Sequence, residues 1–226
     1  MEAVTGAPPE KVRFEVDERG VAVVTLARPD KLNAIDLEMR DLLWTYLLAC
    51  RDIPDLRCVV FRGAGRAFSA GADVSEFGTA PSIMDARRAR HDRDVWGLLL
   101  DLPVPTIARM HGYCYGAGLE LPLCCDLRIA AQSTRFALPE VTLGYIPSAG
   151  GTQTLPRIVP PGVAAHLILT GEPIDATAAL RWGLVHEVAP DDLLDATVER
   201  HIARLLAGEP LPARRLPLGA PWTGAL

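Results

Sequence analysis

Hydrophobic positions alternate with polar ones at the start of the chain and recur with helical spacing soon afterwards. Short apolar runs bounded by turn residues predict strands, and apolar positions three or four residues apart predict helices. The predicted strands are 12–17, 21–27, 57–62, 106–112, 127–131 and 184–188. The predicted helices are 36–52, 84–101, 116–126, 163–170, 175–182 and 191–207, and a loop at 139–155 runs into a further helix.

Strands and helices alternate first, and helices dominate afterwards, which predicts an α/β fold with a smaller helical C-terminal region. We assign residues 12–160 to the α/β core and residues 161–208 to the helical region. Residues 1–11 are expected to form a flexible tail. Residues 209–226 contain four prolines and are expected to form an irregular tail.

Composition and charge then narrow the class of protein. Hydrophobic residues make up 49% of the chain and charged residues 23%, which excludes wholesale disorder. The net charge of −5 argues against a nucleic-acid binder or an anionic-membrane binder, which would need a basic face. The sequence contains no run of 18 apolar residues, and it begins without a signal-peptide pattern, so no membrane span or secretion is expected.

The cysteines and histidines are each five in number and lack the spacing of a metal site. The cysteines lie mostly in apolar runs, which favours buried, reduced thiols in a cytoplasmic protein. Neither a metal nor a separate cofactor is expected.

A glycine-rich turn between strand 106–112 and helix 116–126 is the first candidate site. Gly116-Ala117-Gly118 opens the helix, and free N–H groups at a helix start favour an anion or a developing oxyanion. The alternative is a tight turn that serves only packing. The GxGxxG pattern is absent, so this is not a dinucleotide fingerprint.

Two glutamates stand among apolar residues. Glu120 lies in LELPLCC, where burial should raise its pKa and suit it to proton transfer; the alternative is a carboxylate facing solvent or an arginine. Glu140 lies in a loop close to further glycines, where a lone glutamate is usually structural or solvated. The Gly/Ala-rich loop 63–73 could supply another backbone N–H, or it could be an ordinary loop.

Five motifs in order are RPDKLNA, FSAGAD, HGYCYGAGLELPLCCD, PEVTLGYIPSAGGTQ and LTGEPIDATAALRWGLV. Over residues 12–207 this set resembles the enoyl-CoA hydratase/isomerase, or crotonase, superfamily. The resemblance implies a core of repeated ββα units, a helical C-terminal region that mediates trimerisation, and an acyl-CoA or acyl-carrier thioester as substrate. Relatives continue in helices beyond the position equivalent to Leu226, so this chain resembles a C-terminally short member.

The resemblance also implies roles for particular residues. The backbone N–H groups of Ala72 and Ala117 would bind the thioester oxygen. Glu140 would exchange the proton at C2 and Glu120 would activate the water, with the reverse assignment open because coupled carboxylates share their titration. The other substrate-binding candidates are Ala70, Gly71, Asp73, Val74, Gly116 and Lys31. Arg28 is a second candidate for the CoA phosphates, and Tyr113, Cys114, Tyr145 and Ser148 are candidates for the acyl pocket.

The reaction itself has several candidates. Two carboxylates around one water favour hydration of an enoyl thioester. A double-bond isomerase would need only Glu140, and a decarboxylase or carbon–carbon lyase would keep the same oxyanion chemistry. A non-catalytic acyl-CoA binding protein is a further alternative, whereas a serine hydrolase using Ser69 lacks the GxSxG elbow.

Assembly is expected to be a homotrimer or a dimer of trimers. The apolar residues of the C-terminal helices exceed what a lone helical appendage would need, and large exposed apolar patches usually mark subunit contacts. These residues are Leu167, Ile168, Leu169, Leu193, Leu194, Val198, Ile202, Leu205 and Leu206.

Overall fold

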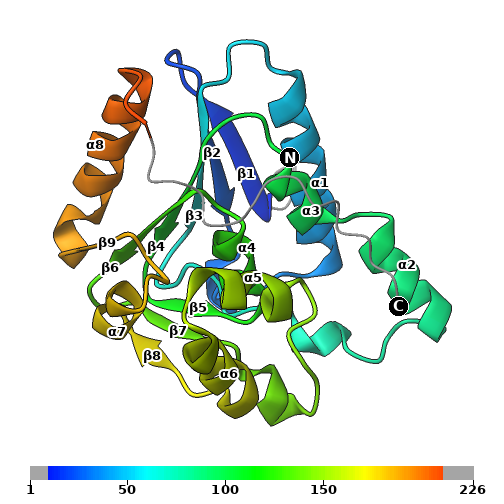
Figure 1. The fold of residues 1–226 in the computed structure, drawn as a ribbon. Coiled ribbons are helices and arrows are strands. Elements are labelled where there is room, and N and C mark those ends of the chain that lie inside the picture. Colours follow the sequence, from blue (N-terminus) through cyan, green and yellow to red (C-terminus); the bar gives the residue numbers. More distant parts are fainter. Residues whose placement is uncertain (1–9, 211–226) are drawn as a thin grey trace, which may run out of the picture.

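A computed structural model describes residues 10–210 and contains two sheets (Figure 1). The larger sheet has the strand order β1-β2-β3-β4-β6-β9, with an antiparallel β1–β2 hairpin and parallel pairing elsewhere. Its strands are β1 (Val12–Val16), β2 (Val21–Leu26), β3 (Cys58–Gly63), β4 (Thr106–Met110), β6 (Leu127–Ala131) and β9 (Glu187–Ala189). The smaller sheet has the order β5-β7-β8, formed by β5 (Tyr113–Tyr115), β7 (Arg135–Ala137) and β8 (Ile174–Asp175).

In two successive pairs of strands, the first strand joins the larger sheet and the second joins the smaller sheet. Strand β4 joins the larger sheet, β5 joins the smaller one, and helix α4 (Ala117–Leu123) follows. Strands β6 and β7 repeat this division and lead to the 3₁₀ segment η3 (Pro139–Leu143) and helix α5 (Gly151–Ile158). These are the repeated ββα units that the resemblance implies, and they place the starts of α4 and α5 on one side of the molecule.

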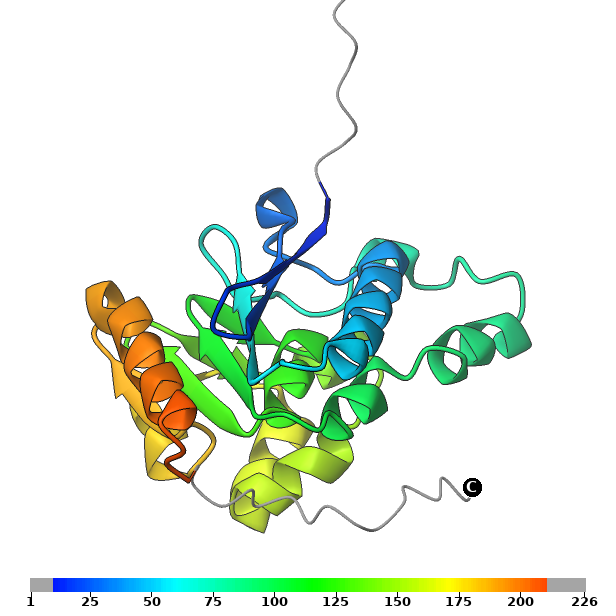
Figure 2. The ribbon, with the colours of Figure 1, turned by 90° about the horizontal axis from the view of Figure 1, so that it is seen from above.

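Helices cover both faces of the larger sheet (Figures 1 and 2). Alternate side chains of a strand point to opposite faces, so Val59 and Phe61 of β3 join the main core while Cys58 and Val60 join a second core. The main core includes α1 (Leu37–Asp52) and α3 (Val95–Leu100), and the second is closed by α8 (Leu194–Leu206). The remaining helices are α2 (Ile83–His91), α6 (Pro161–Thr170) and α7 (Ala176–Arg181).

The predicted helix 84–101 is two helices, α2 and α3, and the prediction of one helix is wrong. Asp94 begins the second helix because its side chain accepts a hydrogen bond from the Gly97 N–H at 2.9 Å. Strands β5, β7 and β8 were missed, since two or three residues are too few to show alternation.

Residues 161–208 hold α6, α7 and α8, and they also supply β8 and β9 to the two sheets. The expected terminal tails fall almost wholly on residues 1–9 and 211–226, outside the described residues. Among the helices of the described part, none is both long enough and apolar enough to cross a membrane.

The apolar residues expected to remain for subunit contacts are largely used within the chain. Leu167, Leu194, Val198 and Ile202 are buried in its own cores. The reason is that α8 lies across a sheet face that would otherwise be open, so its apolar stripe has an intramolecular partner.

Candidate active site

A cavity forms where the loop after β3, the start of α4 and the segment from η3 to α5 meet. Eight of the ten predicted site residues line it: Ala70, Gly71, Ala72, Val74, Gly116, Ala117, Glu120 and Glu140. Asp73 and Lys31 are not among the lining residues. The folding of three distant segments therefore brings together most of the predicted site.

Two glycines allow the backbone to approach closely at this point. Gly71 has φ +106°, and a Cβ there would lie 3.0 Å from the Tyr115 carbonyl oxygen. Gly116 has φ +50°, and a Cβ there would lie 3.1 Å from Oε1 of Glu140. A side chain at either position would be strained and crowded, so glycine keeps these two loops in contact.

Two backbone N–H groups are available at the cavity. Ile35 donates to the Gly71 carbonyl at 2.7 Å and accepts from the Asp73 N–H at 2.9 Å, which turns the intervening N–H of Ala72 to the other edge of the segment. Ala117 is the first residue of α4, where helical N–H groups lack intrahelical partners. Within residues 10–210, neither N–H donates to a backbone carbonyl.

Glu120 is buried, with 2% of its surface exposed. Its Oε1 accepts hydrogen bonds from the N–H groups of Ala149 at 2.9 Å and Gly151 at 2.7 Å, at the start of α5. Two N–H donors and the positive end of a helix dipole favour the ionised carboxylate. Of the two alternatives that the sequence left open, Glu120 is buried rather than exposed to solvent, and backbone donors that the local sequence did not reveal oppose the effect of burial on its charge.

Glu140 is also buried, with 4% exposed, and its surroundings differ. Its Oε2 is fully enclosed and has no hydrogen-bond partner in the part of the chain that the structure describes. Burial raises the pKa of Glu140, because removing water penalises the charged form. The cavity thus contains one buried carboxylate that accepts two backbone N–H groups and one whose pKa is raised by burial.

Residues 17–216 match the sequence model of the family described as enoyl-CoA hydratase/isomerase. The chain belongs to this family. It is 40% identical over 186 residues to a probable enoyl-CoA hydratase of Mycobacterium tuberculosis, an alignment that covers 82% of this chain and 71% of the relative.

Solved structures agree with this assignment and confirm the predicted fold class. An enoyl-CoA hydratase from Mycobacterium smegmatis superposes with a TM-score of 0.82 at 33% identity, covering 87% of this chain and 77% of that one. An enoyl-CoA hydratase/carnithine racemase from Magnetospirillum magneticum gives a TM-score of 0.83 at 32% identity, covering 89% and 76%. The chain therefore has the fold of enoyl-CoA hydratase/isomerase family members.

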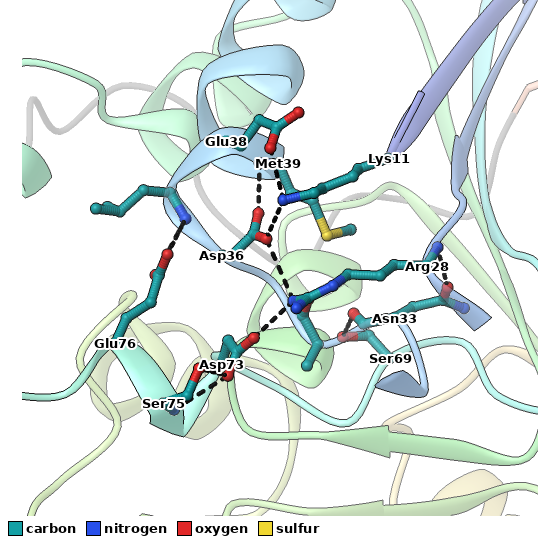
Figure 3. A network of polar contacts seen from close by, with 12 residues as sticks. Lys11, Arg28, Asn33, Asp36, Glu38, Met39, Ser69, Asp73, Ser75 and Glu76 are labelled. Atoms are coloured by element: carbon teal, nitrogen blue, oxygen red, sulfur yellow. Dashed lines mark hydrogen bonds and ion pairs between the residues drawn. The ribbon is translucent and has the colours of Figure 1, made fainter. Parts of the chain in front are cut away.

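Asp73 does not line the cavity, and its side chain joins an ion-pair network (Figure 3). Its carboxylate accepts from the N–H and Oγ of Ser75 at 3.0 and 2.7 Å and pairs with Arg28 at 2.6 Å. The hydrogen bonds from Ser75 and the Arg28 guanidinium lower the pKa of Asp73 to about 2. Lys31 is exposed in the 3₁₀ segment η1 (Pro29–Lys31), away from the cavity lining.

Of the acyl-pocket candidates, Tyr145 and Ser148 line the cavity, and Tyr113 and Cys114 do not. Cys114 is fully buried, and its thiol donates to the Gly118 carbonyl. Phe77, Pro139 and Leu143 line the cavity and were missed. The rings of Phe77 and Tyr145 meet edge to face at 5.3 Å. An apolar residue four positions after Asp73, in a loop of small residues, is the signal that could have found Phe77.

The site residues themselves offer no obvious cation site. Among residues 10–210, no group of three or more His, Cys, Asp or Glu side chains could hold a metal ion.

Proposed function

We propose that this family member is an enoyl-CoA hydratase that adds water reversibly to a trans-2-enoyl thioester. The observation that carries the proposal is the pair of buried carboxylates, Glu120 and Glu140, in opposite environments within one cavity. The same cavity presents the Ala72 and Ala117 N–H groups. Hydration needs an acid, a base and an oxyanion site, and these groups supply all three.

The first role belongs to the backbone. The thioester oxygen would accept hydrogen bonds from the N–H groups of Ala72 and Ala117. Attack at C3 shifts electrons through C2 onto that oxygen, so the N–H groups stabilise a charge that grows in the transition state. Removing one such donor costs about 3–4 kcal/mol in related oxyanion sites.

The second role belongs to the carboxylates. Ionised Glu120 takes a proton from water as the water oxygen bonds to C3, and neutral Glu140 gives its proton to C2. One water is thereby added across the double bond, and the proton shared by the pair has moved from Glu140 to Glu120. It returns to Glu140 through solvent before the next turnover. Dehydration is the same path in reverse.

Substitution of each carboxylate tests the proposal. Glu120→Gln and Glu140→Gln should each lower kcat about 10²- to 10⁴-fold, with KM nearly unchanged, because each removes a proton-transfer group rather than a binding group. The assay follows loss of the conjugated thioester absorbance over a panel of trans-2-enoyl-CoAs. Glu172→Gln, at an exposed glutamate, is the matched control and should keep wild-type kcat.

The double variant and the competing reactions complete this test. Because both carboxylates act on one water, the double variant should lose less than the product of the single losses. Glu120→Gln with near-wild-type hydration would refute the mechanism, and retained double-bond migration in that variant would identify an isomerase. Wild-type protein that binds acyl-CoA with no turnover would support a binding protein instead.

Assembly and compartment complete the proposal. We propose a homotrimer or a dimer of trimers, supported by the family assignment and by Leu169 and Leu193, which are 72% and 50% exposed. Light scattering at micromolar protein should give three or six times the chain mass of 24.4 kDa; a monomer would refute it.

All five cysteines are buried and free, which supports a reducing compartment such as the cytoplasm.

A further inference from the structure

One guanidinium nitrogen connects the loop that carries Ala72 to the start of α1 (Figure 3). Nη1 of Arg28 lies 2.6 Å from Oδ2 of Asp73 and 3.2 Å from Oδ2 of Asp36. The same nitrogen donates to the Ala34 carbonyl at 3.2 Å. Arg28, a candidate for the CoA phosphates on sequence grounds, is therefore engaged inside the protein.

Hydrogen bonds brace the part of this ion-pair network that contains Asp36 and the backbone of Arg28. Asp36 is the N-cap of α1, since its Oδ1 accepts from the Met39 N–H at 2.9 Å. The backbone N–H of Arg28 donates to Oδ1 of Asn33 at 2.8 Å. The Asn33 amide in turn donates to the carbonyl of Ala67 at 2.8 Å. The guanidinium thus projects from a braced turn toward Asp73.

The side that bears Asp73 adjoins the proposed oxyanion donor. Ala72 immediately precedes Asp73, and two backbone bonds to Ile35 flank it. A second tether, from the Leu37 N–H to the Glu76 carboxylate, is exposed and longer, at 3.1–3.2 Å. Among the described residues, the ion pair between Arg28 and Asp73 at 2.6 Å is shorter than the other side-chain links from this loop to earlier elements, such as that from Ser69 Oγ to the Asn33 carbonyl at 2.8 Å.

Charge makes this link sensitive to the loss of Arg28. The side chains of Arg28, Asp36 and Asp73 are only 18%, 7% and 12% exposed, so solvent screens their interactions weakly. Without the guanidinium, two carboxylates would face one another across its position. Removing one partner of a poorly solvated ion pair leaves an uncompensated charge. Asp36 would keep Lys11 as an ion-pair partner at 2.7 Å, so the uncompensated charge would fall on Asp73, in the loop.

We propose that Arg28 is a positioning residue for the oxyanion hole, acting through Asp73 to hold the Ala72 N–H in line with that of Ala117. The inference rests on the proposed function, because it assumes that a thioester oxygen binds between these two donors. Functional donors must be held within about 0.5 Å and 10–20° of the productive geometry, and a side-chain clamp one residue away supplies that constraint.

Arg28→Met, which removes the charge and keeps an unbranched side chain, tests the proposal. Lys11→Met is the matched control, because Lys11 pairs with Asp36 at 2.7 Å in the same network without contacting Asp73. The spectroscopic readout is the infrared stretching frequency of a ¹³C-labelled thioester carbonyl in bound saturated acyl-CoA. Oxyanion donors lower this frequency on binding, whereas a merely structural role would leave the shift intact.

For Arg28→Met we expect a smaller carbonyl shift and a kcat about 10- to 100-fold lower, with KM within about threefold of wild type, because a misplaced donor weakens the transition state more than ground-state binding. Lys11→Met should keep the full carbonyl shift and kcat. Asp73→Asn breaks the same contact from the other side and should reproduce the Arg28→Met result. It also keeps the test available if Arg28→Met does not fold.

The outcomes separate this proposal from the proposed function. A full carbonyl shift in folded Arg28→Met or Asp73→Asn would overturn the positioning role. A raised KM with unchanged kcat in Arg28→Met would also overturn it, in favour of a phosphate contact. A wild-type enzyme that shifts the carbonyl but hydrates no enoyl thioester would refute the hydratase and leave the positioning role standing. An unshifted carbonyl in the wild type would refute both.

Discussion

Glu120 and Glu140 lie in one cavity and are almost equally buried, yet their surroundings are opposite. The start of α5 supplies two N–H donors to Glu120, whereas Oε2 of Glu140 is enclosed with no partner among the described residues. Burial alone would bias both toward the neutral acid. The hydrogen bonds distinguish them, because only Glu120 has backbone donors that favour its ionised form.

The difference matters because proton transfer in both directions at neutral pH needs one acid and one base. Two carboxylates in identical surroundings would compete for a single proton and would share it. Here two segments that both follow β7 produce the asymmetry: α5 turns its first N–H groups toward Glu120, and the 3₁₀ segment η3 carries Glu140. Three experiments test this asymmetry.

The largest effect is expected in proton exchange at C2. A saturated acyl-CoA has exchangeable C2 protons but no double bond for water, so its deuterium uptake from D₂O reports the C2 acid/base alone. Glu140→Gln should slow this exchange about 10²- to 10⁴-fold, and Glu120→Gln should slow it less than about 10-fold. Mass spectrometry of the recovered thioester measures both rates. Equal losses in the two variants would mean that the roles are shared.

A smaller effect is expected in stability. Glu120→Gln weakens two charge-assisted hydrogen bonds and should lower the free energy of unfolding by about 1–3 kcal/mol. Glu140→Gln removes a carboxylate whose ionised form is disfavoured, and should stay within about 0.5 kcal/mol of wild type or rise above it. Urea denaturation at pH 7 compares the two. Destabilisation by Glu140→Gln that exceeds that by Glu120→Gln would contradict the assignment of surroundings.

The smallest effect is expected in the pH dependence of stability. The pKa of Glu140 is raised in the folded protein above its ordinary value of 4.5. The folded state therefore holds this proton more tightly than the unfolded state. The stabilisation is complete below pH 4.5 and is lost as the pH rises through the folded-state pKa. The unfolding free energy of wild type relative to Glu140→Gln should thus fall over that window; a flat difference would exclude a raised pKa.

Regular elements with long patterns were predictable from the sequence. Helix 36–52 was predicted from its apolar spacing and observed as Leu37–Asp52, because an Asp36 N-cap and an amphipathic stripe are local properties. The glycine turn at 116–118 was also predictable, because the positive φ of Gly116 is a local backbone conformation that favours glycine. Motif order was enough to place eight predicted site residues in one cavity.

Contacts between distant segments were decided only by the tertiary structure. The donors to Glu120 lie 29 and 31 residues further along the chain, and Arg28 meets Asp73 across 45 residues. The apolar side of helix α8 packs against the second face of the larger sheet. The local pattern of residues determines which secondary structure a segment prefers and which of its faces is buried. The charge of a buried carboxylate depends instead on which hydrogen-bond donors the packing of the chain brings to it. Sequence motifs were sufficient to identify eight of the residues that line the cavity, whereas the hydrogen-bond donors around each carboxylate followed from the packing of distant segments.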